Sequence, residues 1–116
     1  MKIIDESCEH FVLDLASSSA VPGGGGAASL VGAQGVALAS MVANLTLNSQ
    51  KYKNVHNEMH MIANESAQLV KALNLLVDQD ATGFKPLSEA YSLPADTAEE
   101  KEHKQQVLQS CTKDAC

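Results

Sequence analysis

The feature that most restricts how this chain can fold is a long uncharged stretch. No Asp, Glu, Lys or Arg occurs between Asp14 and Lys51, and Pro22 followed by four glycines, residues 23–26, stands near its start. Proline does not continue a helix, and consecutive glycines lose more conformational freedom on folding than an ordinary turn requires. The pattern therefore indicates a specified loop that separates a short first segment from the rest.

Small residues and good helix formers fill the chain from Ala27 to about Asn48, which predicts a long second helix. Small side chains form one stripe, where another backbone can approach closely, and bulky side chains lie elsewhere. The small residues are Ala28, Gly32, Gly35, Ala39 and Ala43, and the bulky ones are Leu30, Val31, Leu38, Met41, Val42 and Leu45. Because no face carries a charge, we expect this helix to be buried on nearly all sides.

Apolar spacing also predicts a first helix that ends near Ala16 and a third helix that follows the uncharged stretch. The first has Ile4, Cys8, Phe11, Val12 and Leu15 on one stripe. The third begins with Asn54 as its cap and continues through Asp80, to a point where Pro86 is expected to bend or interrupt it.

A fourth helix is expected after Thr97, because Thr97 and Glu100 form a capping box. No strand pattern competes, and aromatic residues make up only 3% of the chain. The sequence therefore predicts one all-α domain over residues 1–116, with about four helices and a long buried second helix. That helix has more apolar faces than three short neighbours can cover, so we expect a helical-bundle homodimer or higher homo-oligomer.

Charge and cysteine content exclude several classes of function. The net charge is -6, with eight lysines, no arginine and no basic cluster, which disfavours nucleic acid as a partner. Acidic residues interrupt the first fifteen positions, where a signal peptide would need an apolar run, so we expect a cytoplasmic protein. Cys8, Cys111 and Cys116 contain no CxxC pair, which favours free thiols and no metal. His56 and His60 have a zinc-compatible spacing but no evident third ligand.

The glycine run and the helix after it have three possible interpretations. A membrane span has the right length, but Ser29, Gln34 and Asn44 weaken its transfer energy, so we expect no membrane insertion. A nucleotide loop would require a βαβ unit or a following Gly-Lys-Ser/Thr, and neither is present. The glycines then either present bare N–H groups to a ligand at a helix start or let two backbones cross tightly.

Residues 22–46, PGGGGAASLVGAQGVALASMVANLT, resemble the signature of the formiminotetrahydrofolate cyclodeaminase and methenyltetrahydrofolate cyclohydrolase family. The resemblance extends to FVLDLASSSAVPGGG, to Lys51 and Tyr52, and to LVDQDATGF and YSLPADTAEEKEHK. It implies an all-helical dimer that acts on a tetrahydrofolate derivative, with no metal or redox cofactor. It also implies that the family's further C-terminal helices lie beyond this chain's last residue, and Gly26 stands where the family usually has Ser.

The resemblance implies two related reactions. A cyclohydrolase hydrolyses 5,10-methenyltetrahydrofolate to 10-formyltetrahydrofolate, and a cyclodeaminase closes a 5-formimino group with release of ammonia. The alternative is a catalytically inactive folate-binding or structural helical dimer.

Either reaction requires proton transfer, for which a half-buried carboxylate is suited. Asp80 is the first choice and Asp78 the second, because the resemblance includes this D-x-D-x-x-x-F region; the alternative is two solvated acids at an exposed bend. The expected substrate-binding residues are Gly23, Gly24, Gly25, Gly26, Ser19, Lys51 and Tyr52. Lys51 and Tyr52 could contact the glutamyl tail or simply form a surface turn, and Ser19 could orient the pteridine or simply finish the first helix.

Overall fold

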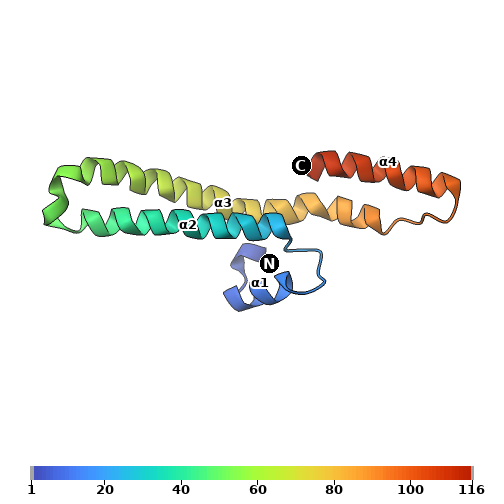
Figure 1. The fold of residues 1–116 in the computed structure, drawn as a ribbon, viewed down its shortest axis with the longest axis horizontal. Coiled ribbons are helices and arrows are strands. Elements are labelled where there is room, and N and C mark those ends of the chain that lie inside the picture. The colour runs from blue at the N-terminus through green and yellow to red at the C-terminus, as the bar shows by residue number, and fades with distance from the viewer. Residues whose placement is uncertain (1, 116) are drawn as a thin grey trace.

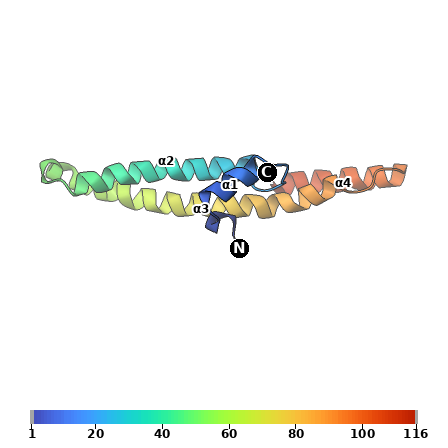
Figure 2. The same cartoon turned by 90° about the horizontal axis from the view of Figure 1, so that it is seen from below.

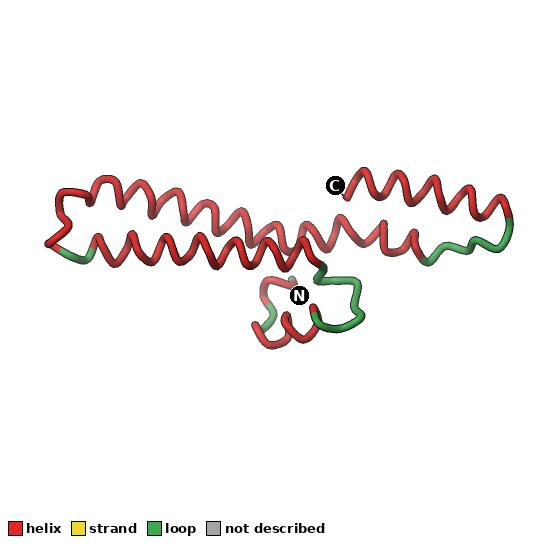
Figure 3. Tube along the Cα trace, viewed as in Figure 1, coloured by secondary structure: helices red, strands yellow, loops and turns green. Residues whose placement is uncertain are grey.

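The computed structural model describes residues 2–115, and within that range it contains helices and no strand (Figures 1 and 3). The four α-helices are α1 (Cys8–Leu15), α2 (Gly24–Leu47), α3 (His56–Tyr91) and α4 (Ala98–Ala115). Two short 3-10 helices, η1 (Ile3–Asp5) and η2 (Gln50–Val55), precede α1 and α3. The predicted all-α fold with four helices is confirmed.

The centre of the molecule is an antiparallel hairpin of α2 and α3 (Figure 1). Gly26, Ala33 and Ala43 of α2 are buried, as are Ser66 and Val77 of α3. The short α1 lies beside the N-terminal end of α2, and α4 folds back along the C-terminal part of α3, as both views show (Figures 1 and 2). The beginning of α2 therefore meets the middle of α3.

The stripe of α2 that faces α3 differs from the predicted stripe of small residues. Of the five predicted residues, only Ala43 is buried, whereas Ala28, Gly35 and Ala39 are exposed. Gly32 does lie close to α3, because a Cβ atom there would be 3.6 Å from both methyl groups of Leu73. The face of α2 that packs against α3 therefore contains Gly26, Ala33 and Ala43.

Two expectations about α2 are wrong for the single chain. The helix begins at Gly24 rather than at Ala27, so three of the four glycines form its first turn, with Gly23 as the N-cap residue. It is also not buried on nearly all sides: Val31 is 68% exposed, Leu38 59% and Leu45 61%. Within one chain α3 covers only one face of α2, so the other apolar faces remain exposed, where the sequence predicts a second copy.

The turn between α2 and α3 is formed by η2 and fixed by a histidine. His56 Nε2 lies 3.1 Å from the carbonyl oxygen of Thr46 and 3.0 Å from that of Ser49. A ring N–H directed at both oxygens adds a second donor to carbonyl groups that already accept backbone bonds, that of Thr46 from the Ser49 N–H and that of Ser49 from the Tyr52 N–H. The expected cap of α3 is wrong, since Asn54 lies within η2 and the N-cap residue, Val55, makes no side-chain capping bond.

Pro86 neither bends the chain out of the helix nor ends it, contrary to expectation, because α3 continues to Tyr91. A helical proline removes one N–H and leaves the carbonyl group four residues earlier without its donor. That carbonyl belongs to Thr82, and Thr82 and Pro86 are both exposed, so water can bond to the oxygen.

The predicted Thr97 cap of α4 is confirmed, whereas the reciprocal bond of the capping box is made to the residue before Thr97. The Thr97 hydroxyl oxygen accepts a hydrogen bond of 3.1 Å from the Glu100 N–H. The Glu100 carboxylate in turn accepts one of 3.1 Å from the N–H of Asp96. α4 then packs on the part of α3 where Leu87 and Ala90 are buried.

The chain is long and thin. Its extents are 73 × 27 × 19 Å and its radius of gyration is 20.4 Å, whereas a compact domain of this length would have about 13 Å. Its accessible surface is 8294 Å², against about 6,100 Å² for a compact monomer of the same mass. Among the described residues α2 is also long and apolar enough to cross a membrane, by length and composition alone.

Candidate active site

Asp80 of α3 lies directly against the first turn of α2. A Cβ atom on Gly25 would be 2.6 Å from Cγ and 2.7 Å from Oδ2 of Asp80, which is too close for a real contact. Only a residue without a side chain lets the carboxylate approach the helix this closely. The glycine at this position is therefore explained by the close approach of a carboxylate from the neighbouring helix.

The loop before α2 is held by serine hydroxyl groups. The Ser19 hydroxyl donates a hydrogen bond of 2.8 Å to the carbonyl oxygen of Val21, and the Ser19 N–H donates one of 3.0 Å to Ser17 Oγ. The Val21–Pro22 peptide bond is cis, and Pro22 is buried. Ser19 thus shapes the loop, and it is absent from the lining of the cavity that the loop encloses.

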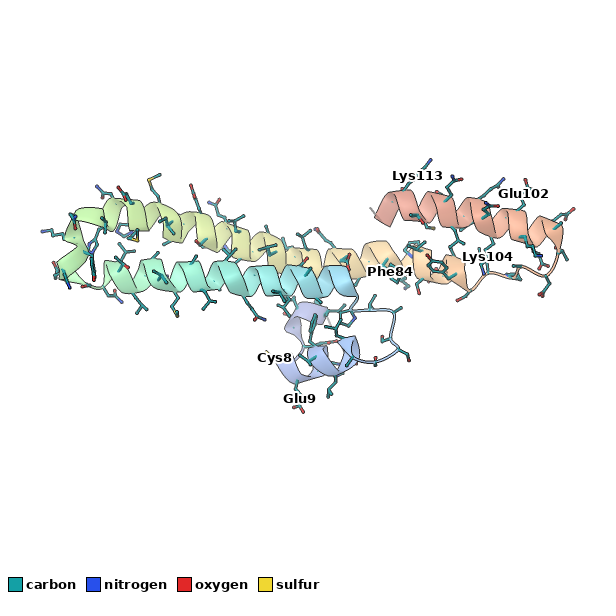
Figure 4. The ribbon with its side chains drawn as sticks, viewed as in Figure 1. Cys8, Glu9, Phe84, Glu102, Lys104 and Lys113 are labelled. Atoms are coloured by element: carbon teal, nitrogen blue, oxygen red, sulfur yellow. The ribbon has the colours of Figure 1, made fainter. Side chains whose placement is uncertain are left out.

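The glycine loop, Asp80 and Phe84 surround a cavity of about 230 Å³. The loop contributes Ala20, Val21 and Gly23 to its lining, and the first turn of α2 contributes Gly24 and Gly25. Figure 4 labels Phe84 beside the point where α2 begins, one helical turn after Asp80. We call this space the glycine-loop cavity.

Donors and an acceptor meet in this cavity. The N–H groups of Gly24 and Gly25 belong to the first turn of α2 and have no hydrogen-bond acceptor within residues 2–115. Asp80 is half-buried, and within the same residues its carboxylate has neither a hydrogen-bond donor nor a cation as partner. The positive end of the α2 dipole favours an anion here. The cavity can therefore both donate to and accept from a polar ligand.

Gly26 fills a different role from Gly25. It is buried, and a Cβ atom there would lie 3.7 Å from the Pro22 side chain and 3.9 Å from Asp80 Oδ2, which are ordinary contact distances. A small side chain therefore fits at position 26, where the resemblance implies Ser. Gly26 packs behind the cavity rather than lining it.

Asp78 does not join Asp80. Its two carboxylate oxygens accept hydrogen bonds from the N–H groups of Ile3, at 2.7 Å, and Ile4, at 3.2 Å. Residues two apart on a helix point in nearly opposite directions, and Asp78 accordingly faces the N-terminal segment. The structure gives it a structural partner and does not place it in the glycine-loop cavity.

Lys51 and Tyr52 are also not brought to the glycines within one chain. Both lie in η2, at the opposite end of α2, which is about 36 Å long at 1.5 Å per residue. There the Lys51 ammonium group lies 5.6 Å from the centre of the Tyr52 ring. A single chain therefore cannot use them in the same site as Gly23.

A larger cavity of about 750 Å³ lies on another side of α3, against the N-terminal segment. Lys2, Lys71, Asn74 and Asp78 are among its lining residues. Size alone would favour this cavity as a ligand site. Its carboxylate is already bonded to two backbone N–H groups, however, whereas the polar groups of the glycine-loop cavity are free, so we place the candidate active site at the glycines.

Two groups of side chains in the structure were not predicted from the sequence. Phe84 lines the glycine-loop cavity, and its spacing of four from Asp80 could have revealed this. Glu6, His10 and Asp14 bring their ligand-type atoms within 4.8 Å of one another, with His10 Nε2 3.1 Å from Asp14 Oδ2. Their regular spacing of four could have revealed this cluster, which does not line the cavity.

The fold and this site define a class: an all-helical protein with a small cavity where a glycine-initiated helix meets a carboxylate. Residues 7–116 match the formiminotransferase-cyclodeaminase family, so the chain belongs to that family.

Comparison with individual proteins gives the same result. The chain is 40% identical over 111 residues to the methenyltetrahydrofolate cyclohydrolase of Methylorubrum extorquens, which covers 96% of this chain and 53% of the relative. It is 36% identical over 107 residues to the formimidoyltransferase-cyclodeaminase of Mus musculus, covering 92% of this chain and 20% of the relative. The chain thus spans about half the length of the cyclohydrolase and a fifth of the cyclodeaminase.

Proposed function

We propose that this protein converts the one-carbon unit of a tetrahydrofolate derivative, as a methenyltetrahydrofolate cyclohydrolase or a formimidoyltetrahydrofolate cyclodeaminase. The proposal rests on one observation: the Asp80 carboxylate lies against the glycine turn of α2 and has no hydrogen-bond donor or cation as partner within residues 2–115. The names of the relatives support the choice of folate as substrate.

The polar groups of the cavity match the needs of such a substrate. The methenyl bridge of 5,10-methenyltetrahydrofolate carries a positive charge, which the Asp80 carboxylate attracts. The free N–H groups of Gly24 and Gly25 can donate to an oxygen atom that forms at the reacting carbon, as backbone donors do in oxyanion holes. Gly23, Gly24 and Gly25 are thus the proposed binding groups and Asp80 the proposed catalytic group, with Gly26 packed behind the cavity.

In the cyclohydrolase reaction Asp80 would move protons. A water molecule attacks the methenyl carbon and gives a proton to the Asp80 carboxylate, which leaves a neutral hydroxyl-bearing intermediate. That proton passes to solvent. The carboxylate then transfers the hydroxyl proton to N5 while the carbon–N5 bond breaks and a carbonyl bond forms. The products are 10-formyltetrahydrofolate and one proton, so atoms and charge balance.

The cyclodeaminase reaction uses the same transfer. N10 attacks the carbon of the protonated formimino group, Asp80 takes the N10 proton, and the same proton goes to the amino group, which leaves as ammonia; the products are the 5,10-methenyl cation and ammonia, so atoms and charge balance. Neither sequence of steps uses a metal or another cofactor. Asp78 and Ser19 have supporting roles in this proposal, since Asp78 bonds the N-terminal segment and Ser19 shapes the loop.

We also propose that two copies associate through the exposed face of α2. The apolar residues Val31, Leu38, Val42 and Leu45, with Gly35 between them, repeat at intervals of four and three, as in helices that pack against each other. The chain exposes roughly 2,000 Å² more than a compact monomer would, which suffices for a stable homodimer interface. A second copy, rather than lipid, would cover this face and keep the protein soluble in the cytoplasm.

The spacing of these exposed apolar residues of α2 suggests where Lys51 and Tyr52 act. Val31 and Leu45 are equally distant from Leu38, so two copies of α2 packed antiparallel about Leu38 pair Val31 with the partner's Leu45. Antiparallel packing also opposes the two helix dipoles favourably. The same register brings the partner's Lys51 and the partner's Tyr52 to the glycine turn. The proposed site is therefore completed across the dimer.

The test is to incubate the purified chain with 5,10-methenyltetrahydrofolate and to follow the loss of its near-ultraviolet absorbance against buffer. A parallel assay measures ammonia released from 5-formiminotetrahydrofolate. Acceleration of the first or second reaction identifies the activity. Binding of reduced folate without turnover would favour the inactive folate-binding alternative, and no binding would contradict the proposal.

A further inference from the structure

A second cavity adjoins the glycine-loop cavity. It measures about 420 Å³, and Ala20 and Val21 line both spaces. Its other walls come from α3, through Thr82, Lys85, Ser88 and Glu89 among others. The two spaces share a wall but differ in chemistry, because the first has backbone donors and Asp80 whereas the second has a lysine and hydroxyl groups.

Successive residues of α3 line the glycine-loop cavity first and the second cavity further along the helix. Asp80, Phe84 and Ser88 lie four residues apart and therefore on one side of the helix. Lys85 lies about 7.5 Å along the helix axis from Asp80, at 1.5 Å per residue. A ligand with its reactive ring at Asp80 and its body along Phe84 would place its far end beside Lys85.

Lys85 is available to bind an anion. Within residues 2–115 no carboxylate lies within 4.0 Å of its ammonium group, although Glu89 stands one turn further on. An incoming carboxylate would therefore not need to displace an existing ion pair. Ser88 and Thr82 add hydroxyl donors in the same cavity.

We propose that this second cavity binds the carboxylate-bearing end of the substrate, with Lys85 as the residue that selects for the negative charge. The inference rests on the proposed function, because it takes the substrate to be a pterin joined to p-aminobenzoyl-glutamate. The pterin occupies the glycine-loop cavity, Phe84 contacts the aromatic middle, and the glutamate carboxylates reach Lys85. Glu89 opposes this binding through its like charge.

Calorimetric titration with 5-formyltetrahydrofolate and with 6-methyltetrahydropterin, which lacks the glutamate, separates the two parts of the site. We expect Lys85→Gln to weaken binding of the folate about threefold to tenfold, as for a partly solvated ion pair. Glu89→Gln should strengthen it, and neither change should alter binding of the pterin. Lys71→Gln is the matched control, since Lys71 is also an exposed lysine of α3 but lines the other large cavity.

The outcomes are distinct. Equal affinity of the unchanged chain and Lys85→Gln for the folate, or an equal loss with Lys71→Gln, would overturn the role of Lys85 while leaving the proposed function intact. Loss of pterin binding in Lys85→Gln would also overturn it, because the effect would not depend on the glutamate. Failure of the unchanged chain to bind either ligand would overturn the proposed function itself.

Discussion

A Cβ atom on Gly25 would lie 2.7 Å from Oδ2 of Asp80, so the side chain of one helix occupies the space that any other residue would need on the next. Gly25→Ala must therefore displace the carboxylate or separate α2 from α3. We expect a loss of at most about 1 kcal/mol in unfolding free energy, because the nearest atoms are the free end of the Asp80 side chain, which can rotate away, and at least a tenfold loss of folate turnover. Urea unfolding and the absorbance assay measure the two effects.

The neighbouring glycines provide matched controls for this change. A Cβ atom on Gly24 would have no neighbour within 4 Å, and one on Gly26 would make only ordinary contacts. Gly24→Ala and Gly26→Ala should therefore be neutral or stabilising by up to about 1 kcal/mol, since alanine favours the helix. If all three substitutions behaved alike, the close approach of Asp80 would not explain Gly25.

Asp78 should matter for stability and not for chemistry. Asp78→Ala removes the acceptor of the Ile3 and Ile4 N–H groups, which we expect to cost about 1–3 kcal/mol. Hydrogen exchange of those two amides should become faster, whereas kcat should stay within about twofold of the unchanged protein. Gln79→Ala, at the exposed neighbouring position, is the control. A large fall in kcat would instead show that Asp78 takes part in catalysis.

The exposed stripe of α2 should control association. Leu38→Glu places a charge at the centre of the proposed interface, where an unpaired buried charge is strongly unfavourable. Light scattering at micromolar concentration should then show a monomer in place of a dimer. Leu13→Glu makes the same change at an exposed leucine of α1, 61% accessible, and should leave the dimer intact. A monomeric unchanged protein would refute the proposed interface.

If the site is completed across the dimer, two inactive variants should restore each other. Lys51→Gln and Asp80→Asn alone should each lose most activity, because every site then lacks one group. After the two proteins are mixed and re-equilibrated, half of the dimers are mixed and each contains one intact site, so activity should return to about a quarter of normal. No recovery on mixing would place Lys51 outside its partner's site.

The local rules of helix formation predicted much of this structure. They predicted the end of the first helix near Ala16, the long second helix and the Thr97 cap, because each of these depends on interactions within a few residues. The glycine run stands out in the sequence by itself, but its contact with Asp80, 55 positions away, leaves no local trace, so the choice of Asp80 depends on the family resemblance. Phe84 differs, because its spacing of four from Asp80 is a local signal that places both residues on one side of the helix.

The errors have physical causes as well. The uncharged sequence of α2 indicates a surface that favours burial, and the sequence does not say whether the same chain or a second copy would bury it. Pro86 interrupts a helix only where the freed carbonyl has no other donor, and the exposed Thr82 carbonyl can reach water. Asp78 resembles Asp80 in sequence, yet the half-turn between them directs one to the N-terminal segment and the other to the glycines.

The central claim is that Asp80 moves protons at a folate bound to the glycine turn. The most direct measurement compares kcat and KM of the unchanged protein and Asp80→Asn with 5,10-methenyltetrahydrofolate. The amide keeps the shape of the side chain but cannot accept the proton, so kcat should fall about a hundredfold to ten-thousandfold with a much smaller change in KM. An Asp80→Asn protein with undiminished kcat would contradict the claim.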